Sequence, residues 1–539
     1  MKPATLRLYQ TLHTWVGLMA GWALFIAFFA GALTVFHEEL HAWQNPLRAN
    51  HASAAIAPAE VDRFVNTLVR THPAAAASTY VIFPNEGEPD FSAYWQNSKG
   101  EWQMTTGSGL AAGKTSPKDL SIEPMKGELA NFLNRLHYSL GLEEPGMYFM
   151  GVISVLYCVA LISGVLLHLP RLKKDLLAVR PGRNLKRFWM DMHNVLGLFS
   201  LPFHLIFAIT APVLCLSILL MTVFNTVSLN GKLFDAVPRV TTAAGTVTAA
   251  HRAAPLLPAE QLLARAREAA GPAFTAKSIH YQHIGDANAV AEVRGSSTRA
   301  VGDYGSVAIR AAADQPDSGK LVGNQTPDVR DTNHAIYSLV YGLHFGTYGD
   351  IALRLAYLVM GLAGAFVFYS GNLLWIESRR KQRQADQPRV HQLLARATVG
   401  VCIGCCVGVM ATFPAALLWP GQSAGVTYYT VFFAAITWAM LRPPARGAVE
   451  LLGAAAVAAV LAPITNAVVT GDHLLRTIAR GDWMVAGFDI GALALACGFI
   501  GLARATLRRG RHGAPDSVWA TPARESHAHR SLRSVAREP

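Results

Sequence analysis

Eight long apolar stretches constrain this chain more than any other feature of its sequence. A helix needs about 20 apolar residues to cross the hydrocarbon core of a bilayer, and the stretches are close to that length or longer, the sixth being the shortest. They occupy residues 15–36, 148–168, 194–221, 350–376, 398–419, 425–441, 448–470 and 484–503. The sequence therefore predicts a polytopic α-helical membrane protein.

The composition agrees with a chain that is dissolved in a bilayer. Of the 539 residues, 52% are hydrophobic and 15% are charged, which is too apolar for an ordinary soluble protein. The net charge is +12, but the Lys and Arg residues cluster beside the apolar stretches and form no face suited to nucleic acid. We therefore expect membrane lipid as a partner and no nucleic acid.

The basic clusters also predict how the chain crosses the membrane. They precede the first stretch and follow the second, fourth, sixth and eighth, so all of them lie on one side. Because positively charged loops stay in the cytoplasm, we expect a bacterial inner-membrane protein with both termini in the cytoplasm.

The six Cys residues all fall inside apolar stretches, so no disulfide framework is expected. Cys402, Cys405 and Cys406 have a spacing that resembles a metal motif, but no polar ligand accompanies them. We interpret them as small buried residues.

Two polar stretches of domain size should then lie in the periplasm. Each has the pattern of one helix, beginning near Pro58 or Pro258, followed by short strands. The expected strands cover residues 79–83 and 91–95 in the first stretch and 289–293 and 306–309 in the second. We predict two separate α+β domains outside the membrane.

These observations divide the chain into seven parts. The expected parts are transmembrane helix 1 in 1–40, a periplasmic domain in 41–135, transmembrane helices 2 and 3 in 136–225, a second periplasmic domain in 226–335, transmembrane helix 4 in 336–380, transmembrane helices 5 to 8 in 381–504, and a disordered cytoplasmic tail in 505–539.

The first 380 residues contain an internal repeat. The first and third stretches begin alike, with His13 four residues before Gly17 and His193 four residues before Gly197. The second and fourth stretches end alike, in Ser-Gly followed by two leucines after one residue, and a histidine precedes each of them. The order of histidine, span, outer domain, histidine and span therefore occurs twice, and we predict a duplicated four-helix core.

The repeated histidines predict a haem site at each side of the membrane. If the halves pack about an axis along the membrane normal, His13 and His193 lie near the cytoplasm, and His137 and His344 lie near the outside. A neutral imidazole binds iron well, and a four-helix core can hold a flat macrocycle, so two pairs suit two b haems with histidine axial ligands. The alternative is that these histidines cap helix starts and reach towards interfacial water.

Other residues complete or complicate this assignment. Glycines one turn after the histidines, including Gly141, would leave room for the ring, and Arg7, Arg135 and Arg187 could pair with propionates. His204 follows His193 by eleven residues, which in a continuous helix places it about 16 Å deeper on the same face, where an electron stepping-stone would be useful.

His168 and His37 leave two questions open. His168 is expected at the depth of His13 and His193 and could replace either as an axial ligand. His37, beside Glu38 and Glu39, is expected at the outer end of the first span, where it contacts substrate or has no special role.

These motifs resemble the PepSY-associated transmembrane helix family, iron-regulated inner-membrane proteins that include siderophore-iron reductases. The resemblance covers roughly residues 5–380 and implies four core helices, PepSY-like outer domains and, in the reductase branch, haem groups that pass electrons outward to ferric chelates. Two features depart from the family pattern, because His168 stands where Trp is more common and the last four spans have no counterpart. The motifs that carry the resemblance are Leu12-His13-x-x-x-Gly17, Arg135-Leu136-His137, Asp191-Met192-His193-x-x-x-Gly197 and Gly342-Leu343-His344.

The leading hypothesis is an enzyme, a ferric-siderophore reductase that passes electrons through haem b to a periplasmic ferric siderophore and releases Fe(II). No catalytic side chain is assigned. The sequence has no Gly-x-Gly-x-x-Gly motif opening a helix after a strand, so the donor is expected to be a quinol or a separate protein. The alternatives are a haem-free scaffold whose PepSY-like domains bind or regulate a periplasmic protein, and a permease with a polar path from His193 to His204.

Overall fold

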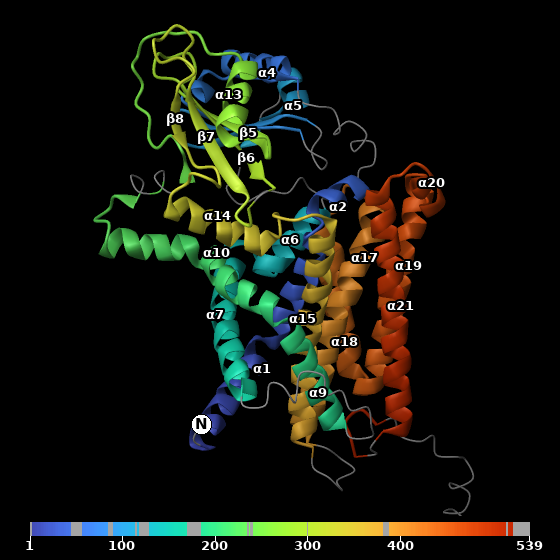
Figure 1. Ribbon diagram of the computed structural model, residues 1–539. Helices are drawn as coiled ribbons and strands as arrows, with labels where there is room; N and C mark the ends of the chain where they lie inside the picture. The colour runs from blue at the N-terminus through green and yellow to red at the C-terminus, as the bar shows by residue number, and fades with distance from the viewer. Residues whose placement is uncertain are drawn as a thin grey trace, which may run out of the picture.

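The structure is a computed structural model that combines a helical bundle with a β-sheet region at one end (Figure 1). We call that end of the bundle the sheet end and the opposite one, where the chain begins, the far end. The structure describes residues 3–44, 57–84, 90–113, 116–117, 129–169, 185–233, 237, 241–298, 300–380, 388–513 and 516–520.

Eight helices in the described part of the chain are long and apolar enough to cross a membrane, and they match the eight expected spans. The protein is thus a multi-pass membrane protein with a separate antiparallel sheet. The fifth span is built from α16 (Arg389–Thr398), the π-helical turn η3 (Val399–Ile403) and α17 (Gly404–Leu418). The others are α1 (Pro3–Thr34), α7 (Glu143–His168), α10 (Leu201–Val227), α15 (Ile351–Ser378), α18 (Ala424–Leu441), α19 (Pro444–Val469) and α21 (Trp483–His512).

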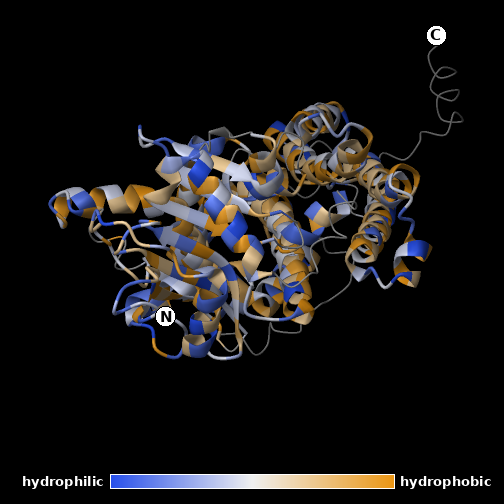
Figure 2. Cartoon of the chain, turned by 90° about the horizontal axis from the view of Figure 1, so that it is seen from above, coloured by the Kyte–Doolittle hydropathy of each residue, from blue (hydrophilic) through white to orange (hydrophobic). Residues whose placement is uncertain are grey.

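The third span differs from the expected continuous helix. It is divided into α9 (Leu185–Phe199) and α10, and the break falls at Ser200, two residues before Pro202. Pro212 lies inside α10, where its ring removes a backbone hydrogen bond and favours a kink. In Figures 1 and 2 the later part of α10 leaves the bundle sideways. The prediction that His193 and His204 share one face of a single helix is therefore wrong.

The core of the bundle is formed by α1, which packs against α7 on one side and α15 on the other. The earlier part of α10 packs on α7, and α9 packs on α15. The four C-terminal spans join this core through a shared apolar cluster, which includes Phe25 and Phe29 of α1 and Cys402 and Cys406 of the fifth span. Cys402, Cys405 and Cys406 are buried, as expected for small core residues.

Within the described residues, one sheet of eight strands replaces the two separate domains that we expected. Its order is β4-β3-β2-β1-β5-β6-β7-β8, and β1 pairs antiparallel with β5, so that Tyr80 lies opposite His280. Joining the halves covers two strand edges that separate domains would have exposed. The strands are β1 (Ser78–Ile82), β2 (Ser92–Gln96), β3 (Trp102–Thr106), β4 (Ser116–Pro117), β5 (Phe274–Gln282), β6 (Val290–Ser297), β7 (Tyr304–Arg310) and β8 (Leu321–Asn324).

Helices cover the sheet on the face away from the bundle. The two expected helices, α4 (Pro58–Thr71) and α13 (Ala259–Ala270), bury apolar side chains against that face. Between the sheet and the bundle lie α2 (His37–Gln44), α6 (Leu129–Ser139) and α14 (Thr332–Phe345) (Figure 1). The remaining short helices are η1 (Pro73–Ala76), α5 (Gly107–Ala111) and α20 (Leu474–Ala479).

The expected disordered tail is partly ordered. Helix α21 continues to His512, and residues 516–520 return to the bundle, where Ser517 donates a hydrogen bond of 2.7 Å to Glu377 and Arg380 pairs with Asp516. The prediction of disorder is therefore wrong for residues 505–513 and 516–520, since the first group continues α21 and ends just after it, and Glu377 and Arg380 hold the second. Residues 521–539 lie outside the described residues.

Candidate haem sites: two facing histidine pairs

The structure brings the rings of His13 and His193 next to each other, in an edge-on arrangement, near the far end of the bundle. His13 comes from α1 and His193 from α9, and their ring centroids are 6.1 Å apart with an angle of 74° between the planes. We call these two residues the far-end pair.

Each imidazole of the far-end pair is fixed through one ring nitrogen. His13 Nδ1 lies 2.7 Å from the carbonyl oxygen of Ala160, and His193 Nδ1 lies 3.0 Å from that of Val367. A carbonyl can only accept, so both Nδ1 atoms carry the proton and both Nε2 atoms keep a lone pair. Histidines that bind metals are held in this way, with the second nitrogen donating to a carbonyl or carboxylate.

Glycines make room for these rings. One turn after Ala160 and Val367 along their helices stand Gly164 and Gly371. A Cβ atom at Gly164 would lie 2.9 Å from Cε1 of His13, and one at Gly371 would lie 3.3 Å from Cε1 of His193. The repeated Ser-Gly motif of the second and fourth spans thus has a physical purpose, because it lets the histidine ring pack directly on the helix backbone.

A second pair lies at the sheet end. His137 of α6 and His344 of α14 have ring centroids 6.0 Å apart, with 39° between their planes. We call these two residues the sheet-end pair. His137 Nδ1 lies 2.8 Å from the carbonyl oxygen of Ala27, and Cβ at Gly31 would lie only 2.5 Å from the same nitrogen.

His344 is fixed by a side chain instead of the backbone. Its Nδ1 lies 2.8 Å from Oγ1 of Thr210, and that hydroxyl donates its own proton to the carbonyl oxygen of Ile206 at 2.8 Å. Because its proton is engaged, Thr210 accepts from His344. All four paired histidines therefore hold Nδ1 in a hydrogen bond and leave Nε2 for a ligand.

Aromatic side chains lie between the two pairs. His204 of α10 is 3% exposed, its Nδ1 is hydrogen-bonded to the hydroxyl of Tyr157, and its Nε2 is buried without a hydrogen-bond partner in the described part of the chain. Its ring lies 5.7 Å from Phe28, which lies 5.7 Å from Phe207, which in turn lies 5.6 Å from His344. The stepping-stone residue expected at His204 thus stands in a continuous chain of rings that leads to the sheet-end pair.

The spacing within each pair suits one metal ion held between two imidazoles. Bonds of about 2 Å from an ion to Nε2 on either side place the ring centres about 6 Å apart. Within the described residues no group of three or more His, Cys, Asp or Glu side chains could hold a metal ion. A haem iron needs only two protein ligands, because the macrocycle supplies the rest.

Several sequence-predicted residues have other partners. Gly141 has a positive φ of 72° after α6, and its Cβ would meet Tyr429, so this glycine serves the turn and leaves no room for a haem. By contrast, no atom lies within 4 Å of a Cβ built at Gly17 or Gly197. His168 is the last residue of α7 and is no part of the two facing pairs.

Charged residues near the sites form ion pairs within the protein. Arg135, a predicted propionate partner, is paired with Glu143 at 3.4 Å, and Glu39 is paired with Arg354 at the start of α15. His37 lies 3.1 Å from the side-chain oxygen of Asn131. These contacts lie within the protein, and the propionate role of Arg135 and the substrate contact of His37 stay predictions.

Sequence reasoning missed the residues that fix the rings. Ala27, Ala160 and Val367 act through backbone carbonyls, which carry no side-chain signal. Thr210 also went unnoticed, because a hydroxyl on an apolar helix is common.

The profile described as the PepSY-associated TM region matches residues 10–378, which include both pairs. An uncharacterized protein of Pseudomonas aeruginosa is 27% identical over 407 residues, covering 71% of this chain and 96% of that protein.

Proposed function

The chain belongs to the PepSY-associated TM family, and from that premise we propose that it is a haem b oxidoreductase that passes electrons across the bacterial inner membrane to a ferric siderophore. We assign the far end to the cytoplasm and the sheet end to the periplasm, since the basic clusters lie on the far-end side of the spans. Both termini are then cytoplasmic and the sheet is periplasmic.

The observation that carries the proposal is the repeated geometry of the two pairs. Each pair combines a centroid separation near 6 Å with two Nδ1 hydrogen bonds, and the arrangement occurs at both ends of the bundle. Buried histidines that serve only to cap helices have no reason to face each other at this distance twice. A duplicated core accounts for the repetition, because each half contributes one histidine to each pair.

The residues present fit two haems. His13 and His193 would hold one, His137 and His344 would hold the other, and the open space at Gly17 and Gly197 would admit part of a ring. Haem iron, when bound, supplies one-electron transfer. The protein itself supplies ligand orientation through the Nδ1 hydrogen bonds, and an apolar surrounding that sets the potential.

The proposed substrate is the one that the family resemblance implies, and the chemistry of iron chelation explains how reduction would release its metal. Siderophore oxygens bind the hard Fe(III) ion better than Fe(II), so one electron weakens the chelate and releases the metal. A ferric siderophore in the periplasm can approach the sheet end, where His344 lies beside Phe345 at 5.2 Å. The product is Fe(II), ready for uptake.

An anaerobic reoxidation experiment tests this function. The haem-loaded full chain is reduced with dithionite, desalted, and mixed with a ferric hydroxamate siderophore and a dye that binds only Fe(II). We expect the reduced b-type band to disappear while about one Fe(II) appears per haem oxidised. The redox-inert gallium(III) complex of the same siderophore is the matched control and should leave the band unchanged.

Two results would contradict the proposal. The first is a reduced band that persists in the presence of the ferric complex. The second is a colourless protein despite full haem supply, which would favour a haem-free scaffold whose sheet binds a periplasmic protein.

A further inference from the structure

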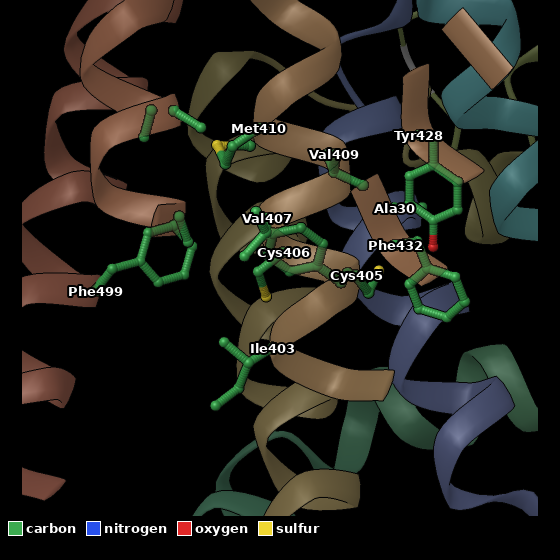
Figure 3. Packing of buried hydrophobic residues seen from close by; sticks show 14 of the residues in the cluster. Ala30, Ile403, Cys405, Cys406, Val407, Val409, Met410, Tyr428, Phe432 and Phe499 are labelled. Carbon is green, nitrogen blue, oxygen red and sulfur yellow. The ribbon is translucent and has the colours of Figure 1, made fainter. Parts of the chain in front are cut away.

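A cavity of about 250 Å³ lies between the core and the C-terminal helices, outside the two histidine pairs. Its walls are mainly apolar, with Phe25 of α1 and Phe366 of α15 on one side and Phe499 of α21 on the other. Figure 3 shows Phe499 pointing from α21 towards Cys406 and Ile403. On α21 the lining extends from residue 495 to 509, a length of about 21 Å.

Polar groups gather at one end of this cavity. Thr506 and Arg509 line it near the end of α21, and the indoles of Trp189 and Trp519 line it from α9 and the returning C-terminal segment. Both indole N–H groups are buried and, among the described residues, have no hydrogen-bond partner. An unpaired buried donor is costly, so this end is suited to a ligand with oxygen acceptors.

The polar end adjoins the far-end pair. Trp189 precedes His193 by one helical turn on α9, and its ring lies 6.3 Å from that of Phe366. Phe366 is followed by Val367, whose carbonyl holds His193. A ring bound at this end would therefore lie against α9 and α15, the two helices that position His193 of the far-end pair.

The cavity is also open to the membrane. Its lining residues Gly498 and Leu502 are exposed, with Leu502 at 45%. A ligand with a long apolar tail can thus enter from the bilayer while its polar ring stays between the helices.

We propose that this cavity binds an isoprenoid quinol, which is the electron donor of the protein. The ring oxygens would accept hydrogen bonds from Trp189 and Trp519, and the isoprenoid tail would lie along the apolar wall. The donor role, unlike the binding itself, rests on the proposed function, because it needs an electron acceptor at the far-end pair.

Oxidation of one quinol to the quinone breaks two O–H bonds and releases two protons and two electrons. The electrons leave one at a time and reduce two ferric ions to Fe(II) on the other side of the membrane. The protons leave to cytoplasmic water at the end where Thr506 and Arg509 lie.

Photolabelling of the detergent-purified full chain tests the binding. The probe is an azido-quinone with a short isoprenoid tail, and the labelled peptides are mapped by mass spectrometry. Gly498→Leu fills the cavity from a position where a Cβ meets no atom within 4 Å, and Gly487→Leu is the matched control in equally open space on the same helix. We expect labelling near Trp189 or Gly498 that Gly498→Leu lowers about tenfold or more and Gly487→Leu leaves unchanged.

Two results would overturn the binding site. Labelling that Gly498→Leu does not reduce would place the quinone elsewhere. Competition by farnesol as strong as by a short-chain quinone would show that the cavity takes only an apolar chain.

The electron-donor role is tested separately, by the rate at which a quinol reduces the haem. A short-chain quinol should reduce the b-type band of the wild-type protein, and about tenfold more slowly that of Gly498→Leu, while dithionite reduces both equally. Labelling without reduction of a haem-loaded protein would overturn the donor assignment. Haem content, measured independently by the pyridine haemochrome method, shows whether the proposed function itself has failed.

Discussion

The far-end pair and the sheet-end pair share a spacing but differ in how their rings are held. His13 and His193 stand on membrane helices, and both are fixed by backbone carbonyls. His137 and His344 stand on short helices between the sheet and the bundle, and one of them depends on the hydroxyl of Thr210. A side-chain substitution can remove a hydroxyl but not a backbone carbonyl. The hydrogen bond that holds His344 can therefore be changed by mutation more easily than those that hold the far-end pair.

Loss of one histidine should have the largest effect and should separate the two pairs. We expect His13→Ala and His137→Ala each to lower haem content from two to about one per chain, and the double variant to carry none. The pyridine haemochrome method measures the content. His512→Ala, at the exposed end of α21, is the control and should keep both haems. If each single variant lost both haems, the pairs would not be independent sites.

Gly31 lies against His137 of the sheet-end pair and tests that pair alone. In Gly31→Ala the added methyl would lie 2.5 Å from Nδ1 of His137, so the ring must move and overpacking costs about 1–3 kcal/mol. We expect loss of the sheet-end haem and retention of the far-end haem. In the control Gly453→Ala the methyl meets no atom within 4 Å, and the spectrum should not change. Normal haem content in Gly31→Ala would mean that His137 is no ligand.

Thr210 tests the difference between the pairs directly. Thr210→Val removes the acceptor of His344 Nδ1, and loss of such a supporting hydrogen bond lowers metal affinity about 10- to 100-fold. The reduction potential of that haem should also rise, because the imidazole becomes a weaker donor. A spectroelectrochemical titration should show one potential shifted and one unchanged, with Thr210→Ser restoring the wild-type value. A shift in both potentials would contradict the assignment of Thr210 to one site.

His280 is a buried histidine outside the two pairs, and its substitution should have the smallest effect on haem content. It stacks on Tyr80 with centroids 3.9 Å apart, and burial, followed by the charge of Arg294, lowers its pKa to about 3. The unfolded state then binds more protons than the folded state below pH 6.5, so stability is complete above that pH and falls as the pH falls towards 3.

This loss of folding stability can be measured by unfolding the protein with denaturant and monitoring the sheet region by circular dichroism. We expect stability to fall by up to about 1.4 kcal/mol per pH unit below pH 6.5, and less steeply in His280→Gln. Haem content of this variant should be unchanged. Equal slopes in the two proteins would show that His280 does not titrate on unfolding.

The sequence predicted the features that depend on local pattern. The eight spans follow from length and hydropathy, and the facing pairs were predicted from the order in which His13, His137, His193 and His344 recur. The break before α10 could also have been predicted, because Pro202 is a helix-start signal.

Features that depend on packing between distant segments could not be predicted. The pairing of β1 with β5 joins residues about 200 positions apart, and no local pattern specifies it. The same holds for Trp519, which reaches the cavity only because Glu377 and Arg380 hold the returning segment. The carbonyl oxygens of Ala27, Ala160 and Val367, which accept hydrogen bonds from the histidine rings, likewise reach their positions through helix packing alone.

The central claim is that both pairs hold haem, and the reduced-minus-oxidised visible spectrum of the purified full chain tests it most directly. With haem quantification, the account predicts a b-type band that corresponds to about two haems per chain. A protein that stays colourless when expressed with ample haem would contradict it.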